Sequence, residues 1–169
     1  MNKVIFNFDL NVNEGQIIGL IGDNGSGKST LLKSVFKEYK KDQGEVKINN
    51  ESIDDNKNLT KICFFPDQSV YPKDTSIIDF ALHDGLLCGL TKNEINSRMN
   101  ELLTNVNLLD YKNKKFDELS AGMQKRAFLA ICLLAKPRFL ILDEPTANLD
   151  VKTRIEFHEI LDILSKKIM

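Results

Sequence analysis

Apolar and polar positions alternate from Val4 to Val12, a period of two that predicts a half-buried strand. The next apolar run, Ile17–Ile21, reads IIGLI without interruption and predicts a fully buried strand. Shorter apolar stretches at 45–48, 62–65 and 139–142 predict further strands. The chain therefore has the pattern of a domain that contains a buried sheet.

Helical periodicity separates these strands. Residues 29–39 place leucine, valine and phenylalanine on one helix face, directly after IIGLI. Two more helices are predicted at 75–87 and 91–109, and Thr91 with Glu94 forms a capping box for the second. This pair is a helical insert among elements that otherwise alternate strand and helix.

The C-terminal third continues the alternation. A helix is predicted at Gly122–Ala135, before the strand at 139–142, and an amphipathic helix at Val151–Ile168, with Asp150 as its cap. A length of 169 residues suits one domain. We therefore predict a single α/β domain over residues 1–169, with the helical insert at about 67–117.

Composition narrows the partners. The 23 basic and 24 acidic residues leave a formal charge of −1, which offers no large positive field for a nucleic-acid backbone. The longest apolar run, residues 127–135, is shorter than the roughly 20 residues that span a bilayer. The alternating N-terminus predicts a strand rather than a signal peptide. No nucleic-acid partner is expected, and any work at a membrane needs another component.

The chain has three cysteines, Cys63, Cys88 and Cys132, without CxxC spacing and with apolar neighbours. This arrangement favours buried thiols over disulfides or a zinc site. It points to a reducing compartment, the cytosol.

The stretch GDNGSGKST, Gly22–Thr30, lies between a predicted strand and a predicted helix, as a phosphate-binding loop must. Its three glycines permit positive φ, and the helix start directs a positive dipole end at an anion. Lys28 would reach the β and γ phosphates, Ser29 would bind Mg²⁺, and Thr30 is a candidate for the α phosphate. The predicted nucleotide-binding residues of this loop are Gly22, Asn24, Gly25, Ser26, Gly27, Lys28, Ser29 and Thr30.

Two adjacent acids follow the strand FLIL. Asp143, at the end of a buried strand, is suited to hold Mg²⁺ or its water. Glu144 points elsewhere and is suited to orient or deprotonate the attacking water. The loop alone fits kinases, GTPases and several ATPases, and the acids alone fit a solvated strand end; together they favour a hydrolase, with Glu144 and Lys28 as catalytic residues.

A third motif, LSAGMQKR at 119–126, opens a helix with Ser120 followed by Gly122. A hydroxyl and backbone N–H groups at a helix start provide a second phosphate contact. Ser120 also caps the helix in the ordinary way. In the chain, LSAGMQKR comes shortly before FLILDEP, and TANLD follows. This order favours a phosphate contact at Ser120 over simple helix capping.

In this order the motifs resemble those of the ATP-binding cassette (ABC) ATPases over essentially the full chain: Walker A (GDNGSGKST), signature (LSAGMQKR), Walker B (FLILDE) and D-loop (Asn148–Asp150). The resemblance implies a P-loop NTPase core with a small N-terminal β subdomain and a helical subdomain insert. It implies ATP and Mg²⁺ as cofactors, with Ser120, Gly122 and Asp150 at the nucleotide. Two such domains, identical or different, would associate head to tail around ATP.

This chain departs from the family pattern in two motifs. The signature has Ala121 and Met123 where the family has glycine and glutamine, while its Ser and second Gly are kept. The family's Q-loop glutamine, a Mg²⁺ contact, corresponds to Gln68, with Asp67 as the alternative.

The resemblance also makes the chain short at both ends. The family's adenine-stacking aromatic precedes the first strand here, and Phe6 and Phe8 are interpreted as core residues. The family's switch histidine follows the final helix, and His158 lies too early to replace it. Reduced adenine affinity, slow turnover and lower stability are expected.

The leading interpretation is the ATP-hydrolysing subunit of an ABC transporter, cytoplasmic and peripheral on the inner face of the cell membrane. Separate transmembrane permease subunits would dock on the insert, where Ile77, Phe80, Leu86 and Leu90 are candidate contacts and equally candidate core residues. The alternatives are a soluble ABC ATPase without a transport role and a truncated, non-catalytic nucleotide-binding module.

Overall fold

The computed structural model describes residues 8–54, 58, 61–66 and 71–168. The chain divides into two compact units, residues 1–59 and 60–168. The first unit holds the glycine-rich loop, and the second holds the adjacent acids and the signature motif. No described helix is long and apolar enough to cross a membrane.

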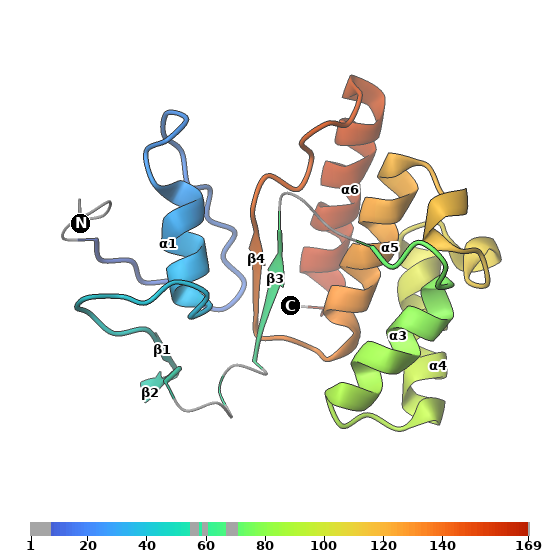
Figure 1. The fold of residues 1–169 in the computed structure, drawn as a ribbon, viewed down its shortest axis with the longest axis horizontal. Helices are drawn as coiled ribbons and strands as arrows, with labels where there is room; N and C mark the ends of the chain where they lie inside the picture. The colour runs from blue at the N-terminus through green and yellow to red at the C-terminus, as the bar shows by residue number, and fades with distance from the viewer. Residues whose placement is uncertain (1–7, 55–57, 59–60, 67–70, 169) are drawn as a thin grey trace. The chain divides into compact units, whose positions relative to one another are not determined.

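The first unit contains α1 (Lys28–Val35) and a hairpin of β1 (Lys47–Ile48) with β2 (Glu51–Ser52), drawn in Figure 1. The hairpin turns at Asn49 and Asn50, whose φ angles are 52° and 64°. Asparagine tolerates this left-handed region, which the two-residue turn of a tight hairpin requires at both positions. The hairpin is the described part of the predicted β subdomain, and only Lys47 and Ile48 of the strand predicted at 45–48 belong to it.

The predicted buried strand at Ile17–Ile21 is wrong in this structure. The segment forms no strand, and Ile17 and Ile21 are 69% and 95% exposed. Residues 8–12 of the other early strand prediction form none either, and residues 4–7 lie outside the described part. An apolar run becomes a buried strand only when another strand supplies its hydrogen bonds, and no described strand pairs with these segments.

The second unit is built on two parallel strands. β3 (Ile62–Phe65) pairs with β4 (Phe139–Leu142), and the register runs from Ile62 opposite Phe139 to Phe65 opposite Leu142. Both strands were predicted at these residues. The pairing continues one step further, because the Asp143 N–H donates to the Phe65 carbonyl at 2.9 Å. The last hydrogen bond therefore fixes the backbone at the first of the two adjacent acids.

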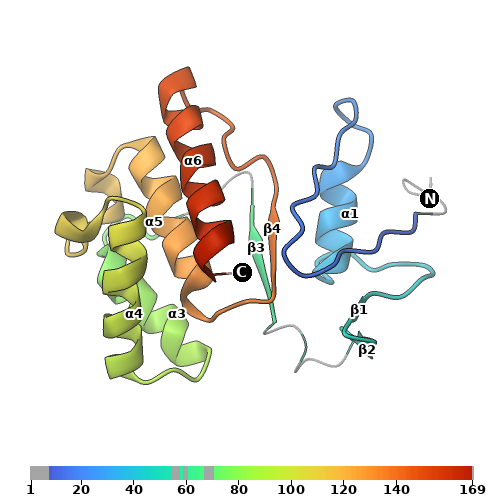
Figure 2. The same ribbon diagram turned by 180° about the vertical axis from the view of Figure 1, so that it is seen from behind.

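The described part of this unit has four helices: α3 (Ile77–Leu87), α4 (Lys92–Asn105), α5 (Ala121–Leu134) and α6 (Val151–Ile168). Two short 3₁₀ turns, Leu109–Tyr111 and Phe116–Glu118, connect α4 to α5. Helix α5 is central, since it contacts α3, α4, α6 and β3 (Figures 1 and 2). The buried residues of α5 belong to one hydrophobic core, which also contains Phe65, Ile77, Ala81, Ile95, Met99, Leu103, Phe116, Phe157, Ile160 and Leu164.

The predicted capping box of α4 is confirmed. Thr91 Oγ1 accepts from the Glu94 N–H at 3.3 Å, and the Glu94 carboxylate accepts from the Thr91 N–H at 2.8 Å. The Thr91 hydroxyl also donates to this carboxylate and is the main reason that the pKa of Glu94 is lowered. The sequence alone placed this helix start correctly, because the signal is local.

We expect Thr91→Ala to lower the free energy of unfolding by about 1 kcal/mol, because an N–H at the helix start loses its acceptor. Thr104 on the same helix is the matched control. Its hydroxyl only donates to the Asn100 carbonyl, at 2.7 Å, so Thr104→Ala should change stability much less. Urea unfolding of both variants measures the difference, and equal losses would contradict the assignment.

The cysteines are all free thiols, as predicted, but they are not all buried. Cys132 is buried, Cys63 is half-buried, and Cys88, just after α3, is exposed. The pKa of Cys132 is raised well above its usual value. The larger cause is a hydrogen bond with Cys63, and the second is the burial of the thiol. No described group of His, Cys, Asp and Glu side chains has the arrangement of a metal site.

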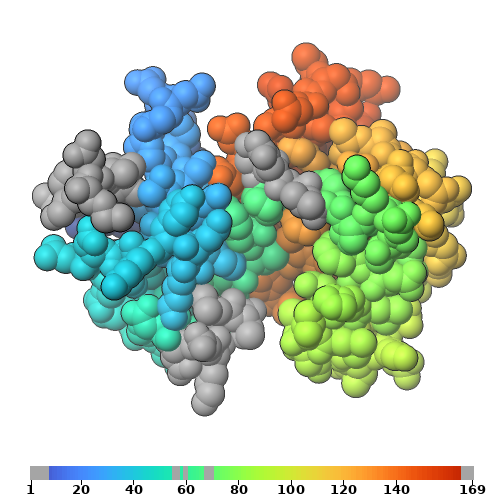
Figure 3. Space-filling view, in the orientation of Figure 1, coloured from blue at the N-terminus to red at the C-terminus, as the bar shows by residue number. Residues whose placement is uncertain are grey.

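The four candidate docking residues of the insert divide into three core residues and one exposed residue. Ile77 is fully buried, and Phe80 and Leu90 pack against the core, so the core interpretation is correct for these three. Leu86 is 48% exposed and its neighbour Leu87 is 74% exposed, at the end of α3, which lies at the surface in Figure 3. Of the four candidate docking residues, Leu86 alone is exposed, and with Leu87 it leaves an apolar end of α3 available to a partner.

Candidate functional site

The glycine-rich loop leads directly into α1. Gly27 is the N-cap with φ 97°, and Gly25 has φ 82°, a region where a side chain would be strained. The Lys28 ammonium donates to the carbonyls of Gly22 and Asp23, at 2.6 and 2.8 Å. The lysine thus folds back over the loop from the first residue of the helix.

Gly22 differs from the prediction, because its φ is not positive. A Cβ at this position would lie 2.9 Å from the Ser26 hydroxyl oxygen, so a larger residue would require the Ser26 side chain to turn away. Asn24 and Ser26 lie exposed in the loop, and Ser29 and Thr30 lie in the first turn of α1. The predicted phosphate-binding residues therefore surround one helix start.

This arrangement fits an anion. The N-terminus of a helix carries a partial positive charge and presents backbone N–H groups, and the Lys28 ammonium lies at the same loop. The first turn of α1 has no acidic side chain to oppose a phosphate. The donors and the charge are those that a triphosphate needs, so the residues present fit ATP.

The two adjacent acids of the second unit are directed differently. Asp143 is only 6% exposed at the end of β4, whereas Glu144 is exposed. Glu144 has φ 45°, a left-handed value that is uncommon for a side chain of this size and turns the chain at the strand end. One carboxylate is therefore held at the sheet, and the next is presented to solvent.

The signature motif opens α5 as predicted. Ser120 is the N-cap, and its Oγ accepts from the Met123 N–H at 3.3 Å. Gly122 is buried, and a Cβ there would fall far inside contact distance of the Thr153 methyl group on α6. The backbone of α5 at Gly122 therefore lies in close contact with the Thr153 side chain at the start of α6.

The same threonine joins this contact to the D-loop. The Thr153 hydroxyl donates to Asp150 at 2.6 Å, and the Thr153 N–H donates to the other carboxylate oxygen at 3.0 Å. Asp150 thus caps α6, as predicted. The signature glycine and the D-loop aspartate both contact one residue, Thr153.

Both hydrogen bonds from Thr153 lower the pKa of Asp150, and the bond from the hydroxyl has the larger effect. A carboxyl whose pKa is lower in the folded state stabilises the fold when ionised. This contribution is present above the unfolded pKa of about 3.9 and is lost as the pH falls through the lower folded value. The cap is therefore in place at neutral pH.

One residue of this region was missed by the sequence analysis. Lys125, one turn after Gly122, is only 8% exposed and donates to the Ala147 carbonyl at 2.9 Å. In a motif that is typical of phosphate binding, a lysine is expected to be a cation at the surface. No neighbouring residue in the sequence indicates that Lys125 is buried. The burial of Lys125 depends on the Ala147 carbonyl, 22 residues away, so no local pattern in the sequence reveals it.

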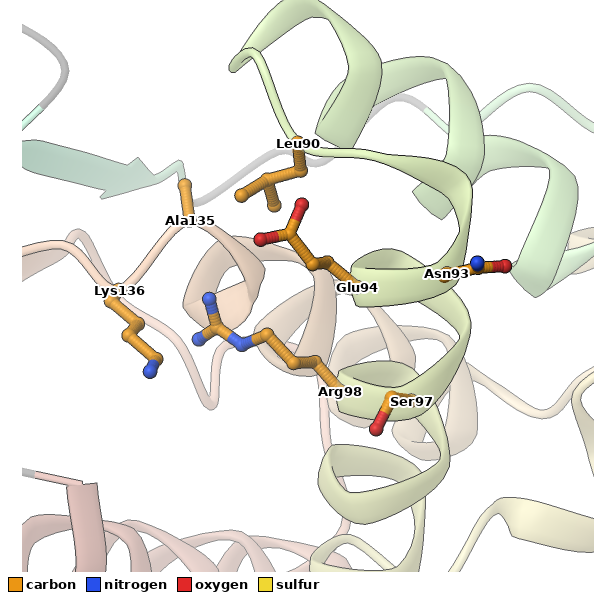
Figure 4. A pocket seen from close by; sticks show the side chains of 7 residues that line it. All are labelled: Leu90, Asn93, Glu94, Ser97, Arg98, Ala135 and Lys136. Atoms are coloured by element: carbon orange, nitrogen blue, oxygen red, sulfur yellow. The ribbon is translucent and has the colours of Figure 1, made fainter.

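Asp67 and Gln68, the two Q-loop candidates, lie outside the described residues. A hollow of about 620 Å³ does lie beside α4. It is lined by Leu90, Asn93, Glu94, Ser97, Arg98, Ala135 and Lys136 (Figure 4). None of these residues was predicted to bind nucleotide, and the Arg98 guanidinium there donates to the Leu133 carbonyl of α5 at 3.2 Å. The hollow is distinct from the predicted nucleotide site.

Comparison with known proteins gives a consistent result. The family model described as "ABC transporter" matches residues 5–147. The chain is 36% identical to the zinc uptake system ATP-binding protein ZurA of Listeria innocua, over 95% of this chain and 65% of that protein. It is 35% identical to the spermidine/putrescine import ATP-binding protein PotA of Mycoplasma capricolum, over 98% of this chain and 47% of that protein. The chain thus spans less than two thirds of these relatives.

Solved structures agree. The structure of cbiO1 from Clostridium perfringens, described as part of the ABC transporter complex cbiONQ, superimposes with a TM-score of 0.80 at 28% identity, over 94% of this chain and 66% of that one. The ATP-binding subunit of another ABC transporter, at 24% identity, has a TM-score of 0.76 over 91% and 65% of the two chains. The predicted α/β fold class, that of the P-loop NTPases, is confirmed.

Proposed function

Because the chain belongs to the ABC transporter family, we propose that it is the ATP-binding and ATP-hydrolysing subunit of an ABC transporter, which powers membrane transport by joining a second such domain head to tail around ATP. The observation that carries the proposal is the loop before α1, where the Lys28 ammonium and a helix N-terminus lie at one anion-binding turn. The relatives named for ATP binding support the nucleotide.

ATP binding is assigned to the first unit. The loop N–H groups and Lys28 hold the β and γ phosphates, and Thr30 lies at the α phosphate. To receive a phosphate, the Lys28 ammonium exchanges its two carbonyl acceptors, Gly22 and Asp23, for phosphate oxygens. Mg²⁺, when bound, neutralises charge between the phosphates, and Ser29, Asp143 and either Gln68 or Asp67 are the proposed residues around it.

Hydrolysis is assigned to Glu144. Its exposed carboxylate lies next to the buried Asp143 and is free to face solvent, so it can orient a water and accept its proton. The left-handed φ of 45° separates it from its neighbour. This division matches a phosphoryl transfer in which one acid serves the metal and the next serves the nucleophile.

The second phosphate contact is assigned to the start of α5. Ser120 is exposed there, on a helix whose N-terminus attracts anions. In a head-to-tail pair, Ser120 and Gly122 of one domain would face the ATP bound to the loop of the other. ATP then acts as a ligand between two domains: it closes the pair when bound and releases it after hydrolysis.

The membrane partner would be a separate permease subunit on the cytoplasmic face of the membrane, docked at the exposed end of α3, Leu86 and Leu87. Relatives named for zinc uptake, Fe(3+) import and polyamine import favour an importer. Their cargoes differ, so the proposal includes none.

The test is ATP titration and phosphate release by the chain and its Lys28→Met variant. We expect the variant to bind ATP about tenfold more weakly or worse, because it loses charge-assisted bonds to the phosphates. Lys33→Met, on the same helix but one turn further along, is the matched control and should bind ATP normally. Equal affinity in all three proteins would contradict the proposal, and binding without hydrolysis in the unchanged chain would favour the non-catalytic module.

A further inference from the structure

A buried cation links the signature helix to the loop that carries Glu144. Lys125 is 8% exposed, and lysine is rarely buried unless its ammonium has a partner. Its Nζ donates to the Ala147 carbonyl at 2.9 Å, across 22 residues of sequence. Burying a charge is unfavourable unless hydrogen bonds replace its hydration, so this bond ties the two segments together.

The bonded carbonyl lies in the same tight turn as Glu144. The Ala147 N–H donates to the Glu144 carbonyl at 3.0 Å, which closes a turn of four residues. Glu144 and Asn148, at the start and just after this turn, have φ angles of 45° and 61°. Such left-handed residues keep their conformation only where the surroundings hold it. The Lys125 ammonium therefore binds the carbonyl of Ala147, the last residue of the hydrogen-bonded turn that begins at Glu144.

The far end of the loop is held independently of Lys125. Leu149 is buried, and its carbonyl accepts from the Arg154 guanidinium of α6 at 3.4 Å. Asp150 then caps α6 through Thr153. Loss of the Lys125 bond should therefore free the turn at Glu144 while the end of the loop and the start of α6 stay in place.

We propose that Lys125 is a positioning residue for ATP hydrolysis, which holds the Glu144–Ala147 turn against α5 and so sets where the Glu144 carboxylate stands. This inference rests on the proposed function, in which Glu144 acts on the attacking water. It also connects two parts of the chain that serve different nucleotides in a head-to-tail pair: Glu144 at its own ATP and the start of α5 at the partner's.

The kinetic test compares Lys125→Met with the unchanged chain. We expect kcat to fall about tenfold, because small displacements of a catalytic group lower the rate steeply, while KM and the Kd for ATP stay within about twofold. Lys125→Arg keeps a cationic donor of similar reach and should recover most of the rate. Lys136→Met, the same change at an exposed lysine just after α5, is the control. An unchanged kcat in Lys125→Met would overturn the proposal.

A second measurement needs no ATP hydrolysis. Hydrogen exchange at the Ala147 amide should accelerate about tenfold in Lys125→Met, while exchange within α4 is unchanged, because the turn loses its hydrogen bond to Lys125. If this variant does not fold, Lys125→Gln, which retains a shorter neutral donor, takes its place. Equal exchange at Ala147 would overturn the inference. If the unchanged chain hydrolyses no ATP, the proposed function is contradicted. The exchange result would still decide whether Lys125 holds the turn.

Discussion

Glu144→Gln is expected to lower kcat for ATP hydrolysis at least about 100-fold, because general-base catalysis contributes roughly 10²–10⁴ and an amide cannot accept the proton of the attacking water. The exposed position of Glu144 makes the exchange structurally mild. ATP affinity should be retained, since the phosphate loop is unchanged. ATP that binds and is not hydrolysed should then hold two domains together.

Light scattering measures this outcome directly. The Glu144→Gln variant should shift from monomer to dimer with Mg-ATP and stay monomeric without it. Glu159→Gln, at an exposed glutamate on α6, is the matched control and should hydrolyse ATP normally. If the variant binds ATP and no dimer forms, the head-to-tail mechanism does not operate in this chain. An undiminished kcat would remove Glu144 from its proposed role.

Gly122→Ala is expected to destabilise the fold by about 3 kcal/mol, the upper part of the usual range for overpacking. A Cβ at this position would overlap the Thr153 methyl group, and both residues lie in the first turns of their helices. The Thr153 side chain cannot turn its methyl group away without moving the hydroxyl that donates to Asp150. Urea unfolding of the variant and the unchanged chain gives the difference.

Thr153→Ser provides the decisive partner for this test. It removes the overlapping methyl group and keeps the hydroxyl that donates to Asp150. In the double variant we expect most of the stability lost in Gly122→Ala to return, which a double-mutant cycle would report as coupling. Additive losses would mean that Gly122 is not constrained by Thr153. A recovered fold would also allow the Gly122→Ala signature to be tested for ATP-dependent dimerisation.

The local signals in the sequence were sufficient for most of the second unit. The start of α4 at Thr91, the strand Phe139–Leu142 and the helix Val151–Ile168 with its Asp150 cap were all predicted with these bounds. Each rests on interactions within a few residues, or on a period that a single element fulfils by itself. The separate settings of Asp143 and Glu144 also follow from their adjacent places at a strand end.

The failures share one cause. IIGLI has the composition of a buried strand, yet a strand needs a partner with free hydrogen-bonding groups, and composition names none. The burial of Lys125 depends on Ala147, 22 residues away, and that of Gly122 on Thr153, on another helix. No window of neighbouring residues contains these pairs.

By itself, the sequence determined the family and predicted the phosphate loop, the acids and the signature, because in each motif the required residue types stand close together in the chain. The tertiary structure alone decided which segments hold these groups in place: the Ala147 carbonyl against Lys125, and Thr153 between Gly122 and Asp150. The physical reason is that chemistry of this kind needs particular side chains at short spacing, whereas their positioning depends on contacts between residues that only folding brings together.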